Sequence, residues 1–178
     1  SVIVKVTDAT QTIQKGKTYT SGSYRYKVTS TDKQTVTVMG PKNKSLKAIK
    51  VYNTVKLGGK SYKVTAVAAS AFKNCKKATS ITIGTNVKEI GNNAFYNCSK
   101  AKKAVINSKV LTKIGSKAFY KCTKLSSVTI KSTKLKSVGK RAFTGTAKKL
   151  VVKVPSKKRA AYKKLLKNKG LSKYAKIK

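Results

Sequence analysis

Residues 87–98 read VKEIGNNAFYNC, and residues 111–122 read LTKIGSKAFYKC. Each stretch holds an aliphatic residue, a second aliphatic residue followed by Gly, then Ala-Phe, and finally Cys, all at the same offsets. The Ala-Phe pair occurs four times along the chain, and its Phe residues are separated by 23, 24 and 24 residues. Self-similarity at such a period is typical of proteins built from stacked repeats.

The first and the last copy each depart from this pattern. Ala68 takes the Gly position in the first copy, and Thr146 takes the Cys position in the last. After each copy, apolar residues follow at spacings of three and then two, which predicts a short strand whose alternate side chains point inward. Ala94 and Cys98 are four residues apart, so the Ala-Phe-x-x-Cys stretch predicts a single helical turn.

A unit of about 24 residues cannot bury its apolar stripe alone, whereas stacked units can. Each strand would then pair with the equivalent strand of the next unit at a spacing of about 4.8 Å. We therefore expect each unit to contain a strand, a turn marked by Gly and a helical turn. Stacking would produce a continuous parallel sheet along one side of a short solenoid.

Together with LKSVGKRAF at residues 135–143, these units resemble the BspA-type, or treponemal-type, leucine-rich repeats of bacterial surface proteins. The resemblance covers residues 62–155 as four repeats. It implies an α/β repeat fold, namely a short leucine-rich-repeat solenoid with a parallel sheet on its concave face. It also implies an exported, cell-surface protein that takes part in adhesion and ligand contact rather than catalysis.

The flanking segments are predicted to cap this solenoid. Residues 1–61 contain the apolar run Val2, Ile3, Val4 and Val6 and several alternating stretches, which predict a β-rich N-terminal cap. Gly58-Gly59 lies between two such stretches and predicts a β-hairpin turn. A small independent domain remains an alternative for this segment.

Residues 156–178 are predicted to form a helical C-terminal cap. A helix is expected at about 157–168, since Tyr162, Leu165 and Leu166 lie on one helical face. Gly170 suits the position that follows a helix end. A short strand is expected near residues 174–177.

The composition argues against catalysis. The chain has 178 residues, 43 Lys and Arg, 3 Asp and Glu and no His, which gives a formal net charge of +40. Without His it lacks the usual proton shuttle and the commonest metal ligand. Three carboxylates, Asp8, Asp32 and Glu89, offer little for acid–base catalysis or for a hard-cation site. We therefore expect no enzymatic activity, no cofactor and no metal.

Cys75, Cys98 and Cys122 all occupy the same position of the repeat. A buried small apolar residue explains that position, because free Cys packs as one. A disulfide between neighbouring units stays open as an alternative. A zinc site would need further ligands, and a nucleophilic Cys would need a base.

The charge raises the question of nucleic-acid binding, because Lys neutralises phosphates and releases counterions. However, the Lys residues are spread over the whole chain, Arg is rare, and the aromatic residues fall mostly in apolar positions. Specific readers of nucleic acid rely on Arg and on exposed aromatic platforms, so we expect no specific nucleic-acid partner. Several lysines are expected on the convex side as a solubilising coat: Lys73, Lys76, Lys77, Lys100, Lys121 and Lys124.

In leucine-rich repeats the exposed strand positions form the concave face. The apolar register places a strip of small, mostly hydroxylated residues edged by Lys there, which suits an extended anionic or polar partner. It also suits a merely solvated strand face. The candidate ligand-binding residues are Ser80, Thr82, Lys103, Val105, Ser127, Thr129, Lys131, Val151 and Lys153.

We therefore expect a non-enzymatic cell-surface or secreted module that mediates adhesion or protein or glycan binding through its concave sheet, assisted by its charge. The expected partner is an acidic glycan, a cell-wall polymer or a host or surface protein. A structural or wall-associated spacer within a longer surface protein is the alternative.

We expect a monomer located outside the cell or at its surface. The sequence shows no export signal, no anchor and no apolar run of the ~20 residues that a membrane span needs. It begins with Ser1 rather than Met, as expected for a mature or trimmed fragment.

Overall fold

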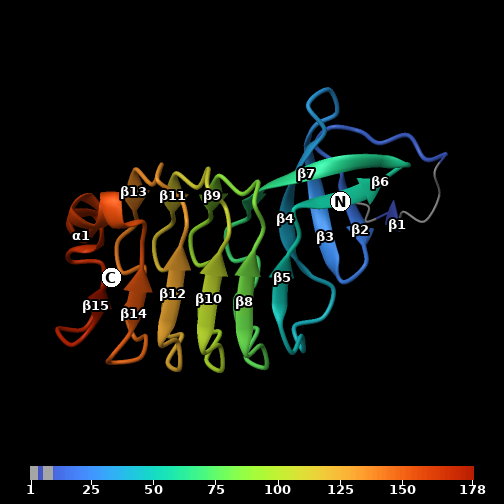
Figure 1. The fold of residues 1–178 in the computed structure, drawn as a ribbon. Helices are drawn as coiled ribbons and strands as arrows, with labels where there is room; N and C mark the ends of the chain where they lie inside the picture. Colours follow the sequence, from blue (N-terminus) through green and yellow to red (C-terminus); the bar gives the residue numbers. More distant parts are fainter. Residues whose placement is uncertain (1–3, 6–9) are drawn as a thin grey trace.

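A computed structural model describes residues 4–5 and 10–178. It shows a β-solenoid whose coils stack side by side, with an N-terminal β-region at one end and a short helix at the other (Figure 1). This confirms the predicted repeat solenoid with a parallel sheet and a helical C-terminal cap. Val2, Ile3 and Val6 of the predicted N-terminal run lie outside the described residues.

One face of the solenoid is a parallel sheet that, across residues 10–178, has six strands. In spatial order these are β5 (Ile49–Val51), β8 (Ser80–Ile83), β10 (Lys103–Ile106), β12 (Ser127–Ile130), β14 (Val151–Lys153) and β15 (Lys176–Ile177). Residues 62–155, the predicted repeat region, contribute β8 to β14. The sheet extends beyond that region at both ends, because β5 pairs with β8 and β15 pairs with β14.

A second sheet lies on the opposite side of the coils and joins the N-terminal region to the solenoid. Its solenoid strands are parallel: the long β7 (Lys60–Val67) is followed by the two-residue strands β9 (Glu89–Ile90), β11 (Lys113–Ile114) and β13 (Ser137–Val138). Its N-terminal strands are β1 (Val4–Lys5), β2 (Thr18–Ser21), β3 (Tyr24–Ser30), β4 (Thr35–Pro41) and β6 (Thr54–Leu57). Strand β4 pairs with β7 in parallel, so the N-terminal strands continue directly into the coils.

The predicted hairpin at Gly58-Gly59 is present between β6 and β7. Both glycines have positive φ, 53° and 75°, a backbone conformation that costs Gly little. The buried apolar residues of the N-terminal strands and of the coils form one continuous cluster. The N-terminal strands therefore share the hydrophobic core of the solenoid.

A column of stacked aromatic rings runs through this core. Phe72, Phe95, Phe119 and Phe143 stack with ring centroids 5.5, 5.3 and 5.4 Å apart, and each is fully buried. At the N-terminal end, the ring of Tyr24 meets Phe72 edge-on, with centroids 5.6 Å apart. The Ala-Phe position of the repeat therefore supplies the contact that links each coil to the next.

The prediction of a helical turn in the Ala-Phe-x-x-Cys stretch was wrong. Asn93 and Asn97 have φ of 57° and 60°, so the segment consists of successive tight turns rather than a helix. The N–H of Phe95 donates to the carbonyl of Ala118 in the next coil at 2.8 Å, instead of to its own coil. Bonds between coils thus alternate with local turn bonds, such as that from the N–H of Tyr96 to the carbonyl of Asn93, and replace part of the local pairing that a helical turn would make.

The Gly that precedes each Ala-Phe pair marks a close approach between coils. A Cβ atom at Gly115 would lie 2.6 Å from the backbone of Gly91 and Asn92, and one at Gly139 would lie 2.2 Å from the N of Ser116. These glycines do not have positive φ, so lack of space excludes a side chain there. The first copy can carry Ala68 because its neighbour is β4 rather than another repeat turn, as the bond from its N–H to Val38 shows.

The C-terminal end is closed by a 3₁₀ turn (Ser156–Lys158) and by α1 (Arg159–Leu166). Tyr162 and Leu166 are buried, and the hydroxyl of Tyr162 donates to the carbonyl of Ser132 and accepts from the N–H of Leu135. Gly170 does not follow the helix end directly, which corrects that prediction. It has φ of 97° and lies against the backbone of Thr144, where a Cβ would clash.

Candidate binding surface

The nine predicted site residues lie on one face of the six-stranded sheet or, for Lys131, directly after β12. We call them the strand face: Ser80, Thr82, Lys103, Val105, Ser127, Thr129, Lys131, Val151 and Lys153. Their sheet neighbours at intervening positions, such as Ile81 and Val128, are fully buried, so the strand face points outward. Its lysines are exposed, and its other residues are partly exposed.

Strand register arranges these side chains in two rows across the coils. One row runs Ser80, Lys103, Ser127, Val151, and the other runs Thr82, Val105, Thr129, Lys153. The sheet adds Lys50 of β5 to the second row, opposite Thr82, and Lys176 of β15 to the first, opposite Val151. The structure thus brings all nine residues onto one surface and flanks it with two further lysines.

Where β5, β8, β10 and β12 end, the surface is hollowed into a groove of about 540 Å³. We call this the carboxyl-edge groove, because it lies at the carboxyl ends of these strands. Its polar and aromatic lining consists of Lys50, Tyr52, Asn53, Thr82, Thr85, Asn107, Lys109 and Lys131. Thr82 and Lys131 therefore belong to both the groove and the strand face.

Tyr52 is the exposed aromatic residue of this groove, with 48% of its surface accessible. Its ring contacts that of buried Tyr24 at 6.2 Å between centroids, and Tyr24 in turn begins the column of Phe rings. The hydroxyl of Tyr24 also accepts a hydrogen bond from the N–H of Lys50 at 2.9 Å. The ring of Tyr52 therefore packs against a residue of the hydrophobic core.

Two buried serines fix the backbone around Lys109 and Lys131. The hydroxyl of Ser108 donates to the carbonyl of Val87 at 2.6 Å, and that of Ser132 lies 2.7 Å from the carbonyl of Leu111 and 3.2 Å from that of Lys109. The chain segments that carry Lys109 and Lys131 are thus tied to the coils before them.

Sequence reasoning missed Lys50, Tyr52, Asn53, Thr85, Asn107 and Lys109 as site residues. The signal was the alternation of Ile49, Lys50 and Val51, which matches Ile81, Thr82 and Ile83 of the next coil. The hairpin of β6 and β7 lies between these strands and lengthens the spacing from Ile49 to Ile81 beyond the regular period. The first coil was therefore not recognised as a repeat.

Lysine ammonium groups lie over the rings of several tyrosines at the surface. Lys50 lies over Tyr52, Lys73 over Tyr96, and Lys148 over Tyr174 at 4.3 Å from the ring centroid. Tyr96 and Tyr120 also stack on each other, 5.0 Å apart. These pairs are exceptions to the expectation that aromatic residues fill apolar positions.

The three cysteines are free and fully buried. The thiols of Cys98 and Cys122 donate to the carbonyls of Phe72 and Phe95 in the preceding coils, at 3.2 and 3.1 Å. Burial raises the pKa of the Cys75 thiol to about 12, and the neighbouring Cys122 thiol together with burial raises the pKa of Cys98. Their side chains act as packing groups, and a protonated, buried thiol is a poor nucleophile.

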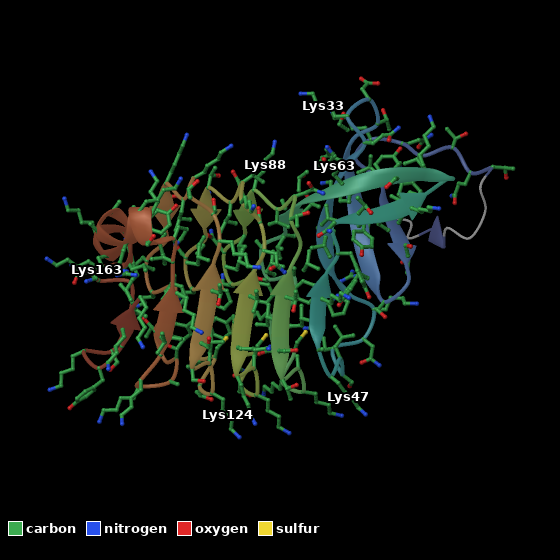
Figure 2. All side chains as sticks on the ribbon, viewed as in Figure 1. Lys33, Lys47, Lys63, Lys88, Lys124 and Lys163 are labelled. Atoms are coloured by element: carbon green, nitrogen blue, oxygen red, sulfur yellow. The ribbon has the colours of Figure 1, made fainter. Side chains whose placement is uncertain are left out.

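Within residues 4–5 and 10–178, no three His, Cys, Asp or Glu side chains gather in a group that could hold a metal ion. Among the same described residues, no helix has the length and apolar character needed to cross a bilayer. Lysines project from both sides of the coils. Lys47 and Lys124 project from one side, and Lys63 and Lys88 project from the other (Figure 2).

Comparison with known proteins identifies the repeat. The family model for the BspA type leucine rich repeat region matches residues 42–172, as six copies. The matched range extends on both sides of the four copies recognised by their Ala-Phe pairs, as the sheet does. No curated protein sequence matches the chain.

Solved structures of bacterial leucine-rich repeat proteins are similar in fold. A leucine rich cell surface protein from Faecalibacterium prausnitzii has 30% identity and a TM-score of 0.63, and the match covers 80% of this chain and 38% of that one. A leucine-rich repeat protein from Bacteroides ovatus has 32% identity and a TM-score of 0.64, with 76% and 36% covered. The leucine rich repeat protein of T. pallidum shares the fold at 21% identity and a TM-score of 0.57, with 74% and 69% covered. The chain therefore spans well under half the length of the first two.

Proposed function

Because this chain belongs to the BspA-type leucine-rich repeat family, we propose that it is a non-enzymatic module of a secreted or cell-surface protein. It mediates adhesion by binding a macromolecular partner through the strand face. The partner is an acidic glycan, a cell-wall polymer or a protein with an acidic surface. The similar protein of F. prausnitzii, described as a cell surface protein, supports the proposed location.

The observation that carries this proposal is the ordered strand face. Stacked coils present the same outward positions in register, so small hydroxylated side chains and Val form two parallel rows edged by Lys. Such a surface is pre-organised, because the coils fix every backbone position before a ligand binds, and this lowers the entropic cost of association. An extended partner can contact several coils at once.

The net charge of +40 supports the choice of an anionic partner. A charge of one sign raises association rates with oppositely charged partners and gives them a marked dependence on salt. The proposal of a non-enzymatic role is consistent with the buried thiols and with the separation of the described carboxylates. Asp32 follows β3, whereas Glu89 lies in β9.

A second candidate function is a structural spacer held by anionic wall polymers. The observation that favours it is the lysine coat on the edges of the coils, which does not single out the strand face (Figure 2). Attraction through such a coat would be non-specific and would weaken smoothly as salt rises.

A pair of composition-matched variants separates the two functions. One combines Ser127→Ala, Thr129→Ala and Lys153→Ala on the strand face. The other combines Ser126→Ala, Thr123→Ala and Lys124→Ala on the turn before β12, and so removes the same groups from an exposed site. Binding to glycans, mucins and acidic proteins is measured at about 150 mM salt.

We expect the strand-face variant to lose about tenfold or more in affinity, equivalent to about 1.4 kcal/mol, and the turn variant to lose less than about twofold. Equal losses in both variants, together with a smooth decline in salt, would reject the strand face and support the spacer.

A further inference from the structure

We propose that the carboxyl-edge groove binds an acidic saccharide built from carboxylated pyranose units. This inference rests on the proposed function, since it assigns a ligand class to one end of the same sheet. The groove volume of about 540 Å³ falls within the range of about 300–1,000 Å³ that is typical of sites for small ligands.

The charged side chains among the described residues that line the groove are all lysines. Lys50 lines it from within β5, Lys109 from the segment after β10, and Lys131 from the position directly after β12, and all three side chains are exposed. In the part of the chain that the structure describes, no carboxylate lines the groove: Asp32 lies in the turn between β3 and β4, and Glu89 lies in β9 of the other sheet. An anionic group in the groove therefore meets ammonium groups without competition from an internal partner, and charge-assisted hydrogen bonds are the stronger kind.

The ring of Tyr52 gives the groove a second mode of recognition. It is 48% exposed and contacts the ring of buried Tyr24. Lys50 lies 5.3 Å from its centroid, a contact worth only about 0.5–1 kcal/mol at an exposed site. The flexible ammonium can therefore turn toward a carboxylate and leave the ring to the apolar C–H face of a pyranose.

The remaining lining supplies neutral hydrogen-bonding groups for sugar hydroxyls. Asn53 shapes this part of the groove: its side-chain oxygen accepts from the N–H of Thr85 at 2.8 Å, and its backbone carbonyl accepts from the side-chain amide of Asn86 at 3.0 Å. The Thr85 hydroxyl and the Asn107 carboxamide lie along the same groove. Polar groups placed around an aromatic ring can fix the orientation of a bound ligand.

An acidic peptide fits this groove less well than a saccharide. Extended peptides are commonly bound by addition to a free strand edge. Strands β8, β10 and β12 are already paired on both sides, so their backbones cannot accept another strand. Strand β5 is the edge strand of this sheet, but the N–H of Lys50 within it already donates to the hydroxyl of Tyr24. A peptide would have to rely on side-chain contacts, which a saccharide uses in any case.

The test is calorimetric titration of the 178-residue chain with oligogalacturonate, a chain of carboxylated pyranose units, at about 150 mM salt. Its methyl ester supplies the ring without the charge, and polyglutamate supplies the carboxylates without the ring. We expect oligogalacturonate to bind at least about tenfold more tightly than either probe.

Matched variants locate the site. Tyr52→Ala and Lys109→Ala should each weaken oligogalacturonate binding by about fivefold to tenfold. Tyr174→Ala is the control, because Tyr174 is 46% exposed and carries lysines over its ring but lies at the other end of the sheet. It should change affinity by less than about twofold, as should Lys124→Ala.

Three outcomes would overturn the inference: no binding of oligogalacturonate, equal binding of polyglutamate, or equal losses in Tyr52→Ala and Tyr174→Ala. Its failure is distinguishable from failure of the proposed function, because Ser127, Thr129 and Lys153 lie on the strand face outside the groove. If their triple variant loses a macromolecular partner while Tyr52→Ala changes nothing, only the saccharide site is rejected.

Discussion

Replacing Gly115 by Ala should destabilise the solenoid through steric contact alone. The added Cβ would lie 2.6 Å from Gly91 C and Asn92 N, and relief to an ordinary contact of about 3.4 Å requires the coils to separate by about 0.8 Å. Two backbone hydrogen bonds cross this contact, from the N–H of Gly115 to Ile90 O at 2.8 Å and from the N–H of Asn93 to Ser116 O at 2.9 Å. Separation would stretch both beyond the usual limit of about 3.2 Å.

These contacts determine how much the substitution lowers the free energy of unfolding. Loss of two hydrogen bonds costs about 1 kcal/mol each, and overpacking costs about 1–3 kcal/mol. The lower entropy of the unfolded Ala chain returns about 0.4–1 kcal/mol. The free energy of unfolding should therefore fall by about 2–5 kcal/mol. At about 2–4 °C per kcal/mol for a chain of this size, Tm should fall by about 4–20 °C.

The control is Gly22→Ala, because Gly22 has a positive φ and room for a side chain, whereas Gly115 has neither. No atom lies within 4 Å of a Cβ at Gly22, but its φ is +56°. This change should cost only the strain of a left-handed residue, about 1–2 kcal/mol. Both variants are measured by urea unfolding followed by circular dichroism and by calorimetry. If Gly115→Ala costs no more than Gly22→Ala, coil-to-coil contact does not exclude side chains at this position, and the reasoning fails.

Further outcomes are expected for the cap, the thiols, the pH and the salt. Tyr162→Phe should lower the free energy of unfolding by about 1–3 kcal/mol in urea titrations, because it leaves Leu135 N–H and Ser132 C=O without their partner; no change would mean that water replaces the hydroxyl. A thiol reagent should modify the three cysteines slowly in the native protein and fully in denaturant, and rapid native labelling would contradict their burial. Between pH 9 and about 12 the unfolded chain loses the Cys75 proton that the folded chain retains, so stability should fall more steeply in the wild type than in Cys75→Ala, measured as unfolding free energy against pH. Raising NaCl from about 0.05 to 0.5 M should raise Tm by calorimetry, because it screens repulsion among the lysines; a constant Tm would show that this repulsion does not limit stability.

The repeats were predictable because the Phe and Gly positions of each unit accept very few residue types. Only Phe fills the stacked column, and only Gly fits at Gly91, Gly115 and Gly139, so the sequence repeats these residues at fixed offsets. The helical turn was mispredicted because two successive tight turns also bury residues four apart. The hydrogen bond from the N–H of Phe95 to the carbonyl of Ala118 takes the place of a helical bond. It joins different coils, so no short stretch of sequence indicates it.

The strand face was largely predictable, whereas the groove was not. Alternation along each strand determined which side chains point outward at positions such as Thr82 and Thr129. The groove depends on the first coil, whose period is lengthened by the hairpin of β6 and β7. It also depends on the contact between Tyr24 and Tyr52, which brings together two residues from different strands.

The in-register pairing of the coils has a consequence for how such surfaces change in evolution. Every interior coil meets its neighbours through the same pairs, so a whole unit can be inserted or removed without creating a new kind of contact. Each added unit extends the sheet by one strand spacing, about 4.8 Å, and adds one more side chain to each outward row. The reach of the surface is therefore set by counting units, and partners of different length can be accommodated by copy number alone.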